Sequence, residues 1–140
     1  MREADLVVGT VLIAGAKAPK LVTREMVRQM EPNSVIVDVS IDQGGCIETI
    51  RPTSHSDPIF REEGVIHYGV TNMPGAVAQT STYALTNRTL KWATLLADNG
   101  FEKAIAMDKA LYKGVNVCNG KVAYKQVADD LHLPYEAVKV

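Results

Sequence analysis

The sequence of 140 residues has few cysteines and no block of like charge. Cys46 and Cys118 form no C-x-x-C pair, and two thiols in a chain without an export signal are more often free than bridged. Fifteen basic against sixteen acidic side chains leave a formal net charge of −1, without the basic run that a nucleic acid needs. We therefore expect free thiols in a reducing compartment and no nucleic-acid partner.

Long apolar segments are also missing. The first five residues lack the basic-then-apolar order of a signal peptide, and the longest apolar run, residues 6–16, is too short to span a bilayer. We expect a soluble, cytoplasmic protein with no membrane partner. Hydrophobic residues nevertheless make up 46% of the chain, which is long enough to bury one core.

Two kinds of ligand motif are absent. His55, His67 and His132 are spread without H-E-x-x-H or another metal-ligand spacing, so we interpret each as a loop or surface histidine and predict no metal site. The chain also lacks G-x-G-x-x-G and the acidic residue about twenty positions later that holds an adenosine ribose. A dinucleotide site here would therefore lack its pyrophosphate turn.

The residues before position 80 have the pattern of a parallel sheet. Three β-branched runs, residues 6–13, 35–41 and 65–70, are each closed by Gly, Asp or Asn. The first two are nearly continuous in apolar residues, which is typical of strands covered on both faces. Thr23 can cap a helix over residues 24–30 between them. A right-handed crossover of this order predicts part of a doubly wound α/β sheet.

After position 80 the pattern becomes helical. Ser81 or Thr82 can cap a long helix that ends at a left-handed Gly100. Its predicted apolar stripe contains Leu85, Thr89, Trp92 and Leu96. Two shorter helices are expected over residues 102–113 and 124–131, separated by a turn-rich stretch. We therefore divide the chain into residues 1–80 and a helical segment, residues 81–140.

Small or polar residues follow all three predicted strands. They are Gly15-Ala16-Lys17, Asp42-Gln43-Gly44-Gly45 and Thr71-Asn72-Met73-Pro74-Gly75. In an open α/β sheet, ligands bind outside the carboxyl ends of the strands. Asp42 is either a turn residue that accepts local backbone N–H bonds or a partly desolvated acid positioned at a cleft. Asp38, inside the strand, is interpreted as a hydrogen-bonded structural carboxylate.

Other charged residues in the first part leave alternatives open. Arg51 is either a surface charge or a group that reaches back from its loop to an anionic cofactor. Lys17 and Lys20 flank Pro19 at a helix entry, and we interpret both as solvated charges.

Four stretches in order carry a resemblance to a known family. They are A-D-L-V-V-G-T-V-L-I-A-G-A-K-A-P-K-L-V-T, V-I-V-D-V-S-I-D-Q-G-G-C-I-E-T-I-R-P-T-S-H-S-D-P, Y-G-V-T-N-M-P-G-A-V and T-S-T-Y-A-L-T-N. With I-D-Q-G-G and N-M-P-G at family spacing, the chain resembles the alanine dehydrogenases. These are NAD-dependent oxidoreductases of amino-acid catabolism that interconvert L-alanine and pyruvate with ammonia. Residues 90–135 look like the same family's C-terminus.

The resemblance implies only the later part of such an enzyme. Residues 1–80 would be the distal half of a Rossmann NAD-binding domain, its last three strands, and residues 81–140 would return to the substrate domain. The pyrophosphate turn, the catalytic His and the substrate-binding Arg and Lys would lie upstream. We expect the fragment to be inactive alone and to form a homo-oligomer, because the edge of its first strand is unpaired, either by edge pairing or by helix exchange. An N-terminal segment is the expected complementing partner.

The resemblance also assigns site residues one by one. Asp42 matches the active-site Asp beside the nicotinamide, and Arg51 matches a cofactor-contacting Arg. The remaining cofactor-binding matches are Val11 and Leu12 near the adenosine, Val39, Ser40 and Ile41 lining the cofactor, and Thr71, Asn72, Met73 and Pro74 in the loop that holds the nicotinamide end.

Two other functions stay open. One is a non-catalytic, self-associating remnant of a dehydrogenase gene. The other is the NAD-binding component of a transhydrogenase, which usually shows a V-D-L-A-A-E-like strand end where this chain has V-S-I-D-Q-G-G. D-2-hydroxyacid dehydrogenases rank lower again, because they place an Arg near this strand end.

Overall fold

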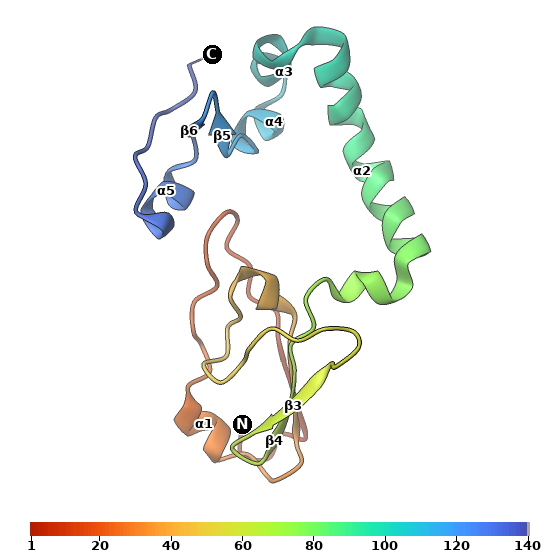
Figure 1. The fold of residues 1–140 in the computed structure, drawn as a ribbon, viewed down its shortest axis with the longest axis vertical. Coiled ribbons are helices and arrows are strands. Elements are labelled where there is room, and N and C mark those ends of the chain that lie inside the picture. The colour runs from red at the N-terminus through yellow and green to blue at the C-terminus, as the bar shows by residue number, and fades with distance from the viewer. Residues whose placement is uncertain (140) are drawn as a thin grey trace. The chain divides into compact units, whose positions relative to one another are not determined.

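The structure, a computed structural model, describes residues 1–139 (Figure 1). Its contacts divide the chain into a first unit, Met1–Ala76, and a second unit that begins at Val77. Each unit has its own secondary structure.

The first unit is built on a four-stranded sheet with the order β1-β2-β4-β3. Its strands are β1 (Leu6–Gly9), β2 (Val35–Asp38), β3 (Ile59–Glu62) and β4 (Val65–Tyr68). β1 and β4 run parallel to β2 on either side of it, and β3 runs antiparallel to β4. The predicted α/β class and its three parallel strands are confirmed.

Strand β3 was not predicted. It joins β4 through a two-residue turn in which Glu63 and Gly64 both have positive φ, 53° and 79°. Such a turn matches the twist of a hairpin. Asn or Asp commonly precedes the glycine of this turn, and glutamate at that position weakens the sequence signal.

All three parallel strands are shorter than predicted. The second ends at Asp38 rather than at Ile41, because the carboxylate of Asp38 accepts a hydrogen bond from Ser40 N–H and starts a 3₁₀-helix, η1 (Val39–Gln43). Apolar residues continue into η1, so hydrophobicity alone did not mark the end of the strand. A second 3₁₀-helix, η2 (Met73–Val77), follows the last strand.

One face of the sheet is covered by α1 (Arg24–Arg28), whose N-cap Thr23 accepts from Met26 N–H as predicted. The helix ends two residues earlier than expected. The core cluster on this face consists of Ala18, Val27, Met30, Ile36, Cys46, Ile47 and Val65. Cys46 and Cys118 are both free thiols, as expected.

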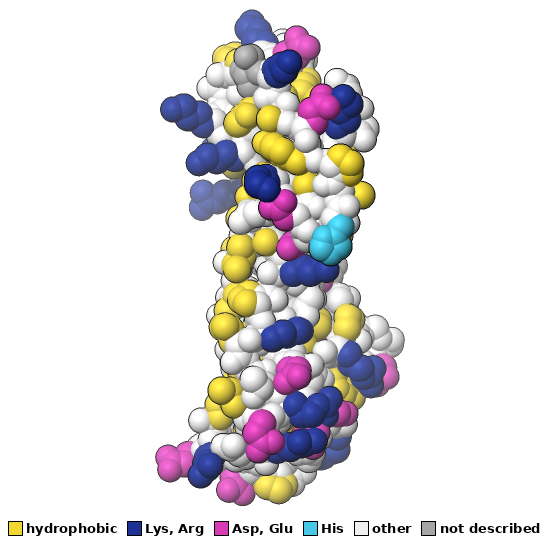
Figure 2. All heavy atoms as spheres, turned by 90° about the vertical axis from the view of Figure 1, so that its left-hand side faces the viewer, with side chains coloured by type: hydrophobic (Ala, Val, Ile, Leu, Met, Phe, Trp, Pro, Cys, Tyr) yellow, Lys and Arg dark blue, Asp and Glu magenta, His cyan; other side chains and the backbone are white. Residues whose placement is uncertain are grey.

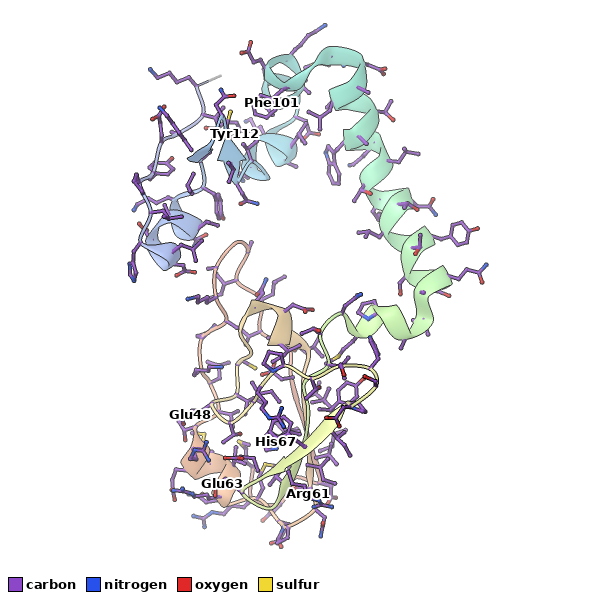
Figure 3. The ribbon with its side chains drawn as sticks, viewed as in Figure 1. Glu48, Arg61, Glu63, His67, Phe101 and Tyr112 are labelled. Atoms are coloured by element: carbon purple, nitrogen blue, oxygen red, sulfur yellow. The ribbon has the colours of Figure 1, made fainter. Side chains whose placement is uncertain are left out.

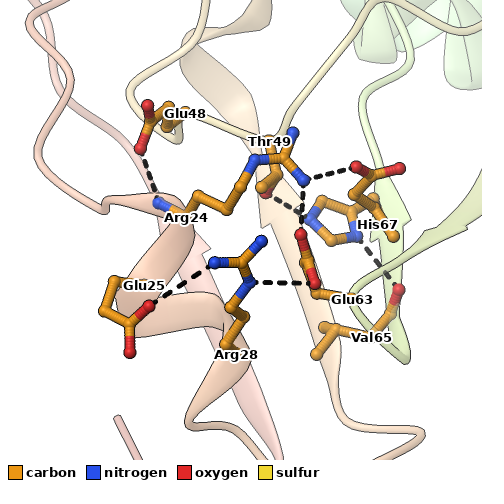
Figure 4. Close-up of polar contacts among 9 residues, drawn as sticks. Arg24, Glu25, Arg28, Glu48, Thr49, Glu63, Val65 and His67 are labelled. Atoms are coloured by element: carbon orange, nitrogen blue, oxygen red, sulfur yellow. Dashed lines mark hydrogen bonds and ion pairs between the residues drawn. The ribbon is translucent and has the colours of Figure 1, made fainter.

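Ion pairs hold α1 against the β3–β4 hairpin. Arg24 donates to Glu62 at 2.6 Å and also to Glu63, and Arg28 pairs with Glu63 at 3.2 Å (Figure 4). The two arginines lower the pKa of the Glu63 carboxyl below its usual value, with Arg24 the larger cause. Glu48 accepts from the backbone N–H of Arg24, and Glu48 and Glu63 flank the helix (Figure 3).

The opposite face of the sheet is open and, apart from Arg61 on β3, apolar. Leu6 and Val8 on β1 are 56% and 53% exposed, and Ile59 on β3 is also exposed. Their cross-strand neighbours on this face are the half-buried Val35, Val37, Ile66 and Tyr68. The prediction that both faces are covered is therefore wrong for this unit. β1 forms one outer edge of the sheet, as predicted.

His67 on β4 is fully buried, so its interpretation as a loop or surface histidine is wrong. Its Nδ1 lies 3.0 Å from the carbonyl of Val65 and its Nε2 lies 2.7 Å from the hydroxyl of Thr49 (Figure 4). A carbonyl only accepts, so Nδ1 carries the proton and Nε2 accepts from Thr49. The ring also stacks on Phe60. This arrangement holds a neutral imidazole, and burial lowers the pKa of His67.

Acidification is expected to destabilise the first unit through His67. The folded pKa lies below the unfolded value of about 6.5, so the unfolded chain takes up the proton first. The unfolding free energy should fall as the pH drops below about 6.5, until the folded imidazole is itself protonated. An NMR titration of the imidazole Cε1–H checks this. A protonated His67 in the folded chain at pH 6.5 would contradict it, and H67Q should flatten the pH dependence while H55Q leaves it in place.

The second unit is mainly helical. Its elements are α2 (Ala78–Asn99), α3 (Phe101–Met107), α4 (Lys109–Lys113), β5 (Val117–Cys118), β6 (Lys121–Val122) and α5 (Lys125–Leu131). The helical C-terminal segment is thus confirmed. No helix among residues 1–139 is both long enough and apolar enough to cross a membrane.

Three details of this unit differ from the prediction. α2 begins at Ala78 without a side-chain cap, so neither Ser81 nor Thr82 starts it, although it does end at Gly100. The helix expected over residues 102–113 is interrupted at Asp108, whose carboxylate accepts from Ala110 N–H and Leu111 N–H and starts α4. The turn-rich stretch is a short β5–β6 hairpin.

Candidate functional site

The loops after the three parallel strands meet at one end of the sheet. Ser40 Oγ donates to the carbonyl of Val11 at 2.8 Å, which joins the loop after β1 to η1. Asn72 N–H lies 3.3 Å and 3.4 Å from the two carboxylate oxygens of Asp42, which joins η1 to the loop after β4. Two contacts thus connect three segments that the sequence predicts to converge.

Asp42 lies in η1, is exposed, and accepts from an N–H thirty residues away rather than from its own turn. The carboxylate that accepts hydrogen bonds from the backbone of the turn is that of Asp38, which is completely buried. Its carboxylate accepts from the backbone N–H groups of Ser40, Cys46 and Ile47 at 2.9, 2.7 and 3.1 Å. The structural role predicted for Asp38 is confirmed. Asp42 is left with an accessible carboxylate that has only long hydrogen bonds.

The two glycines after Asp42 have different constraints. Gly44 and Gly45 both have positive φ, 91° and 72°. A Cβ at Gly44 would meet no atom within 4 Å, whereas one at Gly45 would lie 2.4 Å from Ile50 Cγ2 and 2.8 Å from Asp38 Oδ2. Gly44 is required for backbone conformation alone, and Gly45 is required for close packing as well.

His55 is a residue of this site that the sequence analysis missed. Its Nε2 donates to the carbonyl of Asn72 at 3.0 Å, from a loop seventeen residues earlier. An isolated parallel bridge between Thr53 and Val70 brings the two segments together. A single bridge of this kind leaves no periodicity in the sequence, so spacing could not have indicated it.

Lys20 is not the solvated charge that we expected. Its ammonium donates to the carbonyls of Gly44, Gly45 and Ile47 at 2.7, 2.9 and 3.2 Å. Residues 18–22 run beside residues 43–48, with backbone bonds such as Ala18 N–H to Gln43 O. Lys20 therefore belongs to the support of the turn that follows Asp42.

The other residues assigned by resemblance fall into two groups. Ser40 and Ile41 are buried, so their side chains are occupied within the unit. The exposed group is Leu12, Val39, Thr71, Asn72 and Pro74, with Val11 and Met73 half-buried. Arg51 places its guanidinium 4.2 Å above the ring of Phe60. Among residues 1–139, no group of three or more His, Cys, Asp or Glu could hold a metal ion.

The arrangement presents a carboxylate, backbone amides and small apolar groups on one wall. Acidic and basic side chains are interspersed over the lower part of the face in Figure 2, so that face offers no block of one sign to a polyanion. Val39 and Leu12 offer apolar surface, and Asp42 offers a negative charge. An exposed carboxylate next to apolar side chains can stabilise a nearby positive charge.

Comparison with known proteins identifies the class and then the family. The fold belongs to the Rossmann-type α/β class, and the profile described as "Alanine dehydrogenase/PNT, C-terminal domain" matches residues 1–125. The chain belongs to this family. It is 60% identical to the alanine dehydrogenase of Methanococcus maripaludis and 55% identical to that of Halomonas elongata, in each case over 96% of this chain.

Two solved structures of related proteins have a similar fold. An L-alanine dehydrogenase superposes with a TM-score of 0.75 at 50% identity, covering 94% of this chain and 36% of that chain. A transhydrogenase from Sinorhizobium meliloti gives a TM-score of 0.58 at 34% identity, covering 69% of this chain and 27% of that one. The chain spans 36% of the length of the two curated relatives. The resemblance stated from the sequence is confirmed.

The two glycines give a matched test of the turn. Gly44→Ala should cost about 1 kcal/mol, because only the left-handed backbone is unfavourable. Gly45→Ala should cost at least about 3 kcal/mol, because a methyl group also overlaps Ile50 and Asp38. Urea unfolding followed by NMR signals of the first unit measures both. Equal losses for the two variants would contradict the close packing at Gly45.

Proposed function

We propose that this chain supplies the nicotinamide-side wall of an alanine dehydrogenase active site, with Asp42 as the catalytic carboxylate. The contact between Asp42 and Asn72 carries the proposal, because it brings together two loops at the carboxyl ends of parallel strands. Identities of 55–60% to alanine dehydrogenases favour NAD, L-alanine and pyruvate as the ligands.

Each assigned residue then has a physical role. When bound, the nicotinamide of NAD would accept a hydride from the α-carbon of alanine. The carboxylate of Asp42 stabilises positive charge beside it, on the oxidised ring or on the substrate amino group. Val39 gives apolar contact along the cofactor, Leu12 gives apolar contact near the adenosine, and the loop 71–74 offers backbone groups to the nicotinamide end. Arg51 would contact the cofactor from the edge of this wall.

The chain lacks the other wall. A G-x-G-x-x-G turn supplies backbone N–H bonds to a charged pyrophosphate, each worth about 1.5–3 kcal/mol. Losing three of them costs roughly 5–9 kcal/mol, which is about three to six decades of affinity. We therefore propose that activity needs a complementing N-terminal segment, corresponding to the part of the relatives that this chain does not span.

The open face and edge of the sheet fit such a segment. β1 is an outer edge of the sheet with one row of backbone groups unpaired, and Leu6 and Val8 present apolar side chains beside it. Ile59 lies on the same face at the opposite edge, on β3. A strand added to β1 would pair its free backbone groups, and helices laid over this face would cover its apolar side chains. Without that segment, two copies of the chain can cover the same surface, which is the basis for a homo-oligomer.

Complementation tests the enzymatic role. The part of the Methanococcus maripaludis enzyme that precedes the matched region is expressed with this chain, and alanine-dependent NADH formation is measured. We expect activity only in the mixture, and calorimetry should show no micromolar NADH affinity for the chain alone. Asp42→Asn should lower kcat by about 100-fold, the range of a positioned acid or base, whereas Asp57→Asn makes the same change of charge in a nearby loop and should not.

Two results would contradict the proposal. Micromolar NADH binding by the isolated chain would show that the missing turn is not required. If the mixture is active and D42N and D57N have the same kcat, Asp42 has no catalytic role. A stable but inactive mixture would instead favour the non-catalytic remnant.

The uncovered face of the sheet also predicts self-association. Alone, the chain should sediment above its monomer mass at micromolar concentration, because the apolar face of β1 is uncovered. Val8→Lys places a charge on that face and should shift the chain toward monomer. Val117→Lys is the matched control, since Val117 is similarly exposed, at 60% against 53%, but lies in the second unit. A wild-type monomer across this range would contradict the expectation.

The transhydrogenase component remains the second candidate. The Sinorhizobium meliloti structure supports it at the level of fold, with 34% identity over 69% of this chain. The alanine dehydrogenase structure covers 94% of the chain at 50% identity, and it is therefore the better guide to the site. Complementation with alanine as the substrate distinguishes the two.

A further inference from the structure

The turn after Asp42 is held between two charges of opposite sign. On one side lies the ammonium of Lys20, which has three N–H donors and directs them at the carbonyls of Gly44, Gly45 and Ile47. On the other side lies the buried carboxylate of Asp38, which accepts from backbone N–H groups of the same turn.

The two charges meet on a single peptide unit. The carbonyl of Gly45 accepts from Lys20 at 2.9 Å, and the N–H of Cys46, in the same peptide plane, donates to Asp38 at 2.7 Å. The dipole of this peptide therefore points its oxygen at a cation and its hydrogen at an anion. Charge-assisted bonds of this type are stronger than neutral ones, and here they fix the plane from both ends.

This peptide is connected to Asp42 by short backbone bonds. Gly45 N–H donates to the carbonyl of Ser40 at 3.0 Å, and Gly44 N–H donates to that of Ile41 at 2.9 Å. Both acceptors belong to η1, which carries Asp42. A rotation of the Gly45–Cys46 peptide would disturb these bonds and move the carboxylate relative to Asn72.

We propose that Lys20 is a positioning residue for Asp42, acting with Asp38 as a clamp on the Gly45–Cys46 peptide. Lys20 does not touch the reacting groups in this scheme; it fixes the turn from which Asp42 projects. Its enzymatic consequence rests on the proposed function, whereas its effect on the turn is independent of it.

Amide hydrogen exchange in the isolated chain tests the clamp directly. In Lys20→Met, exchange at Gly45 and Cys46 should become about tenfold faster, while Ile66 on β4, whose N–H bonds to Ser34, should not change. Lys20→Arg keeps the charge and should recover part of the protection, since a planar guanidinium cannot direct donors at all three carbonyls. Lys109→Met removes a lysine charge in the second unit and serves as the control.

Local and global effects separate in this measurement. If Lys20 only contributes to overall stability, exchange at Ile66 will accelerate together with Gly45 and Cys46, and the proposal fails. It also fails if K20M leaves all three amides unchanged.

The complemented enzyme provides the kinetic test. K20M should lower kcat about tenfold with less than a threefold change in the KM for NAD, because a misplaced Asp42 affects the chemical step more than cofactor binding. K20R should restore part of kcat, and K109M should match the wild type. An active wild-type mixture with an unaltered K20M overturns the inference. An inactive wild-type mixture instead counts against the proposed function, and the exchange result then decides on the clamp.

Discussion

The buried carboxylate of Asp38 is the constraint on which the rest of the first unit depends. A charge without solvent is tolerated only when hydrogen bonds replace its hydration, and three backbone N–H groups do so here. Those bonds end β2, start η1 and bring residues 46 and 47 back beneath the strand. These bonds also determine the position of Asp42, because Asp38 binds Ser40 on one side of it in the chain and Cys46 and Ile47 on the other. The carboxylate of Asp38 is thus enclosed by backbone N–H groups, whereas that of Asp42 stays exposed at the end of the sheet.

The sequence predicted what local chemistry determines. Parallel strands, α1 with its Thr23 cap, the stop at Gly100 and the structural role of Asp38 all follow from patterns within a few residues. The features that the sequence did not predict depend on contacts between segments that are distant in the chain. His67 is buried because β3 stacks Phe60 on it, and β3 itself was missed because Glu63-Gly64 is an unusual hairpin turn. No periodicity connects a histidine or a lysine to carbonyls seventeen to twenty-seven residues away.

The two faces of the sheet are buried unequally. One face has α1 and a packed cluster, and the other exposes Leu6, Val8 and Ile59. The apolar runs were interpreted as strands covered on both faces, and this failed for the present unit although the residues are of the expected type. The side chains on this face are of the apolar type that a covered sheet requires, but no element of the first unit packs over them. The two curated relatives are almost three times as long, and in the proposed function the part that this chain does not span covers this face.

The support of the candidate site is nevertheless internal to the first unit. Val11 accepts from Ser40, Asn72 donates to Asp42, and Lys20 with Asp38 fixes the turn between them. All of these contacts are made between residues of the first unit. A complementing segment would then add contacts to a wall already in place, without having to order its loops. Weak cofactor binding by the isolated chain would then be due to the absence of hydrogen bonds to the pyrophosphate. The binding free energy gained on assembly would be close to that of these pyrophosphate contacts.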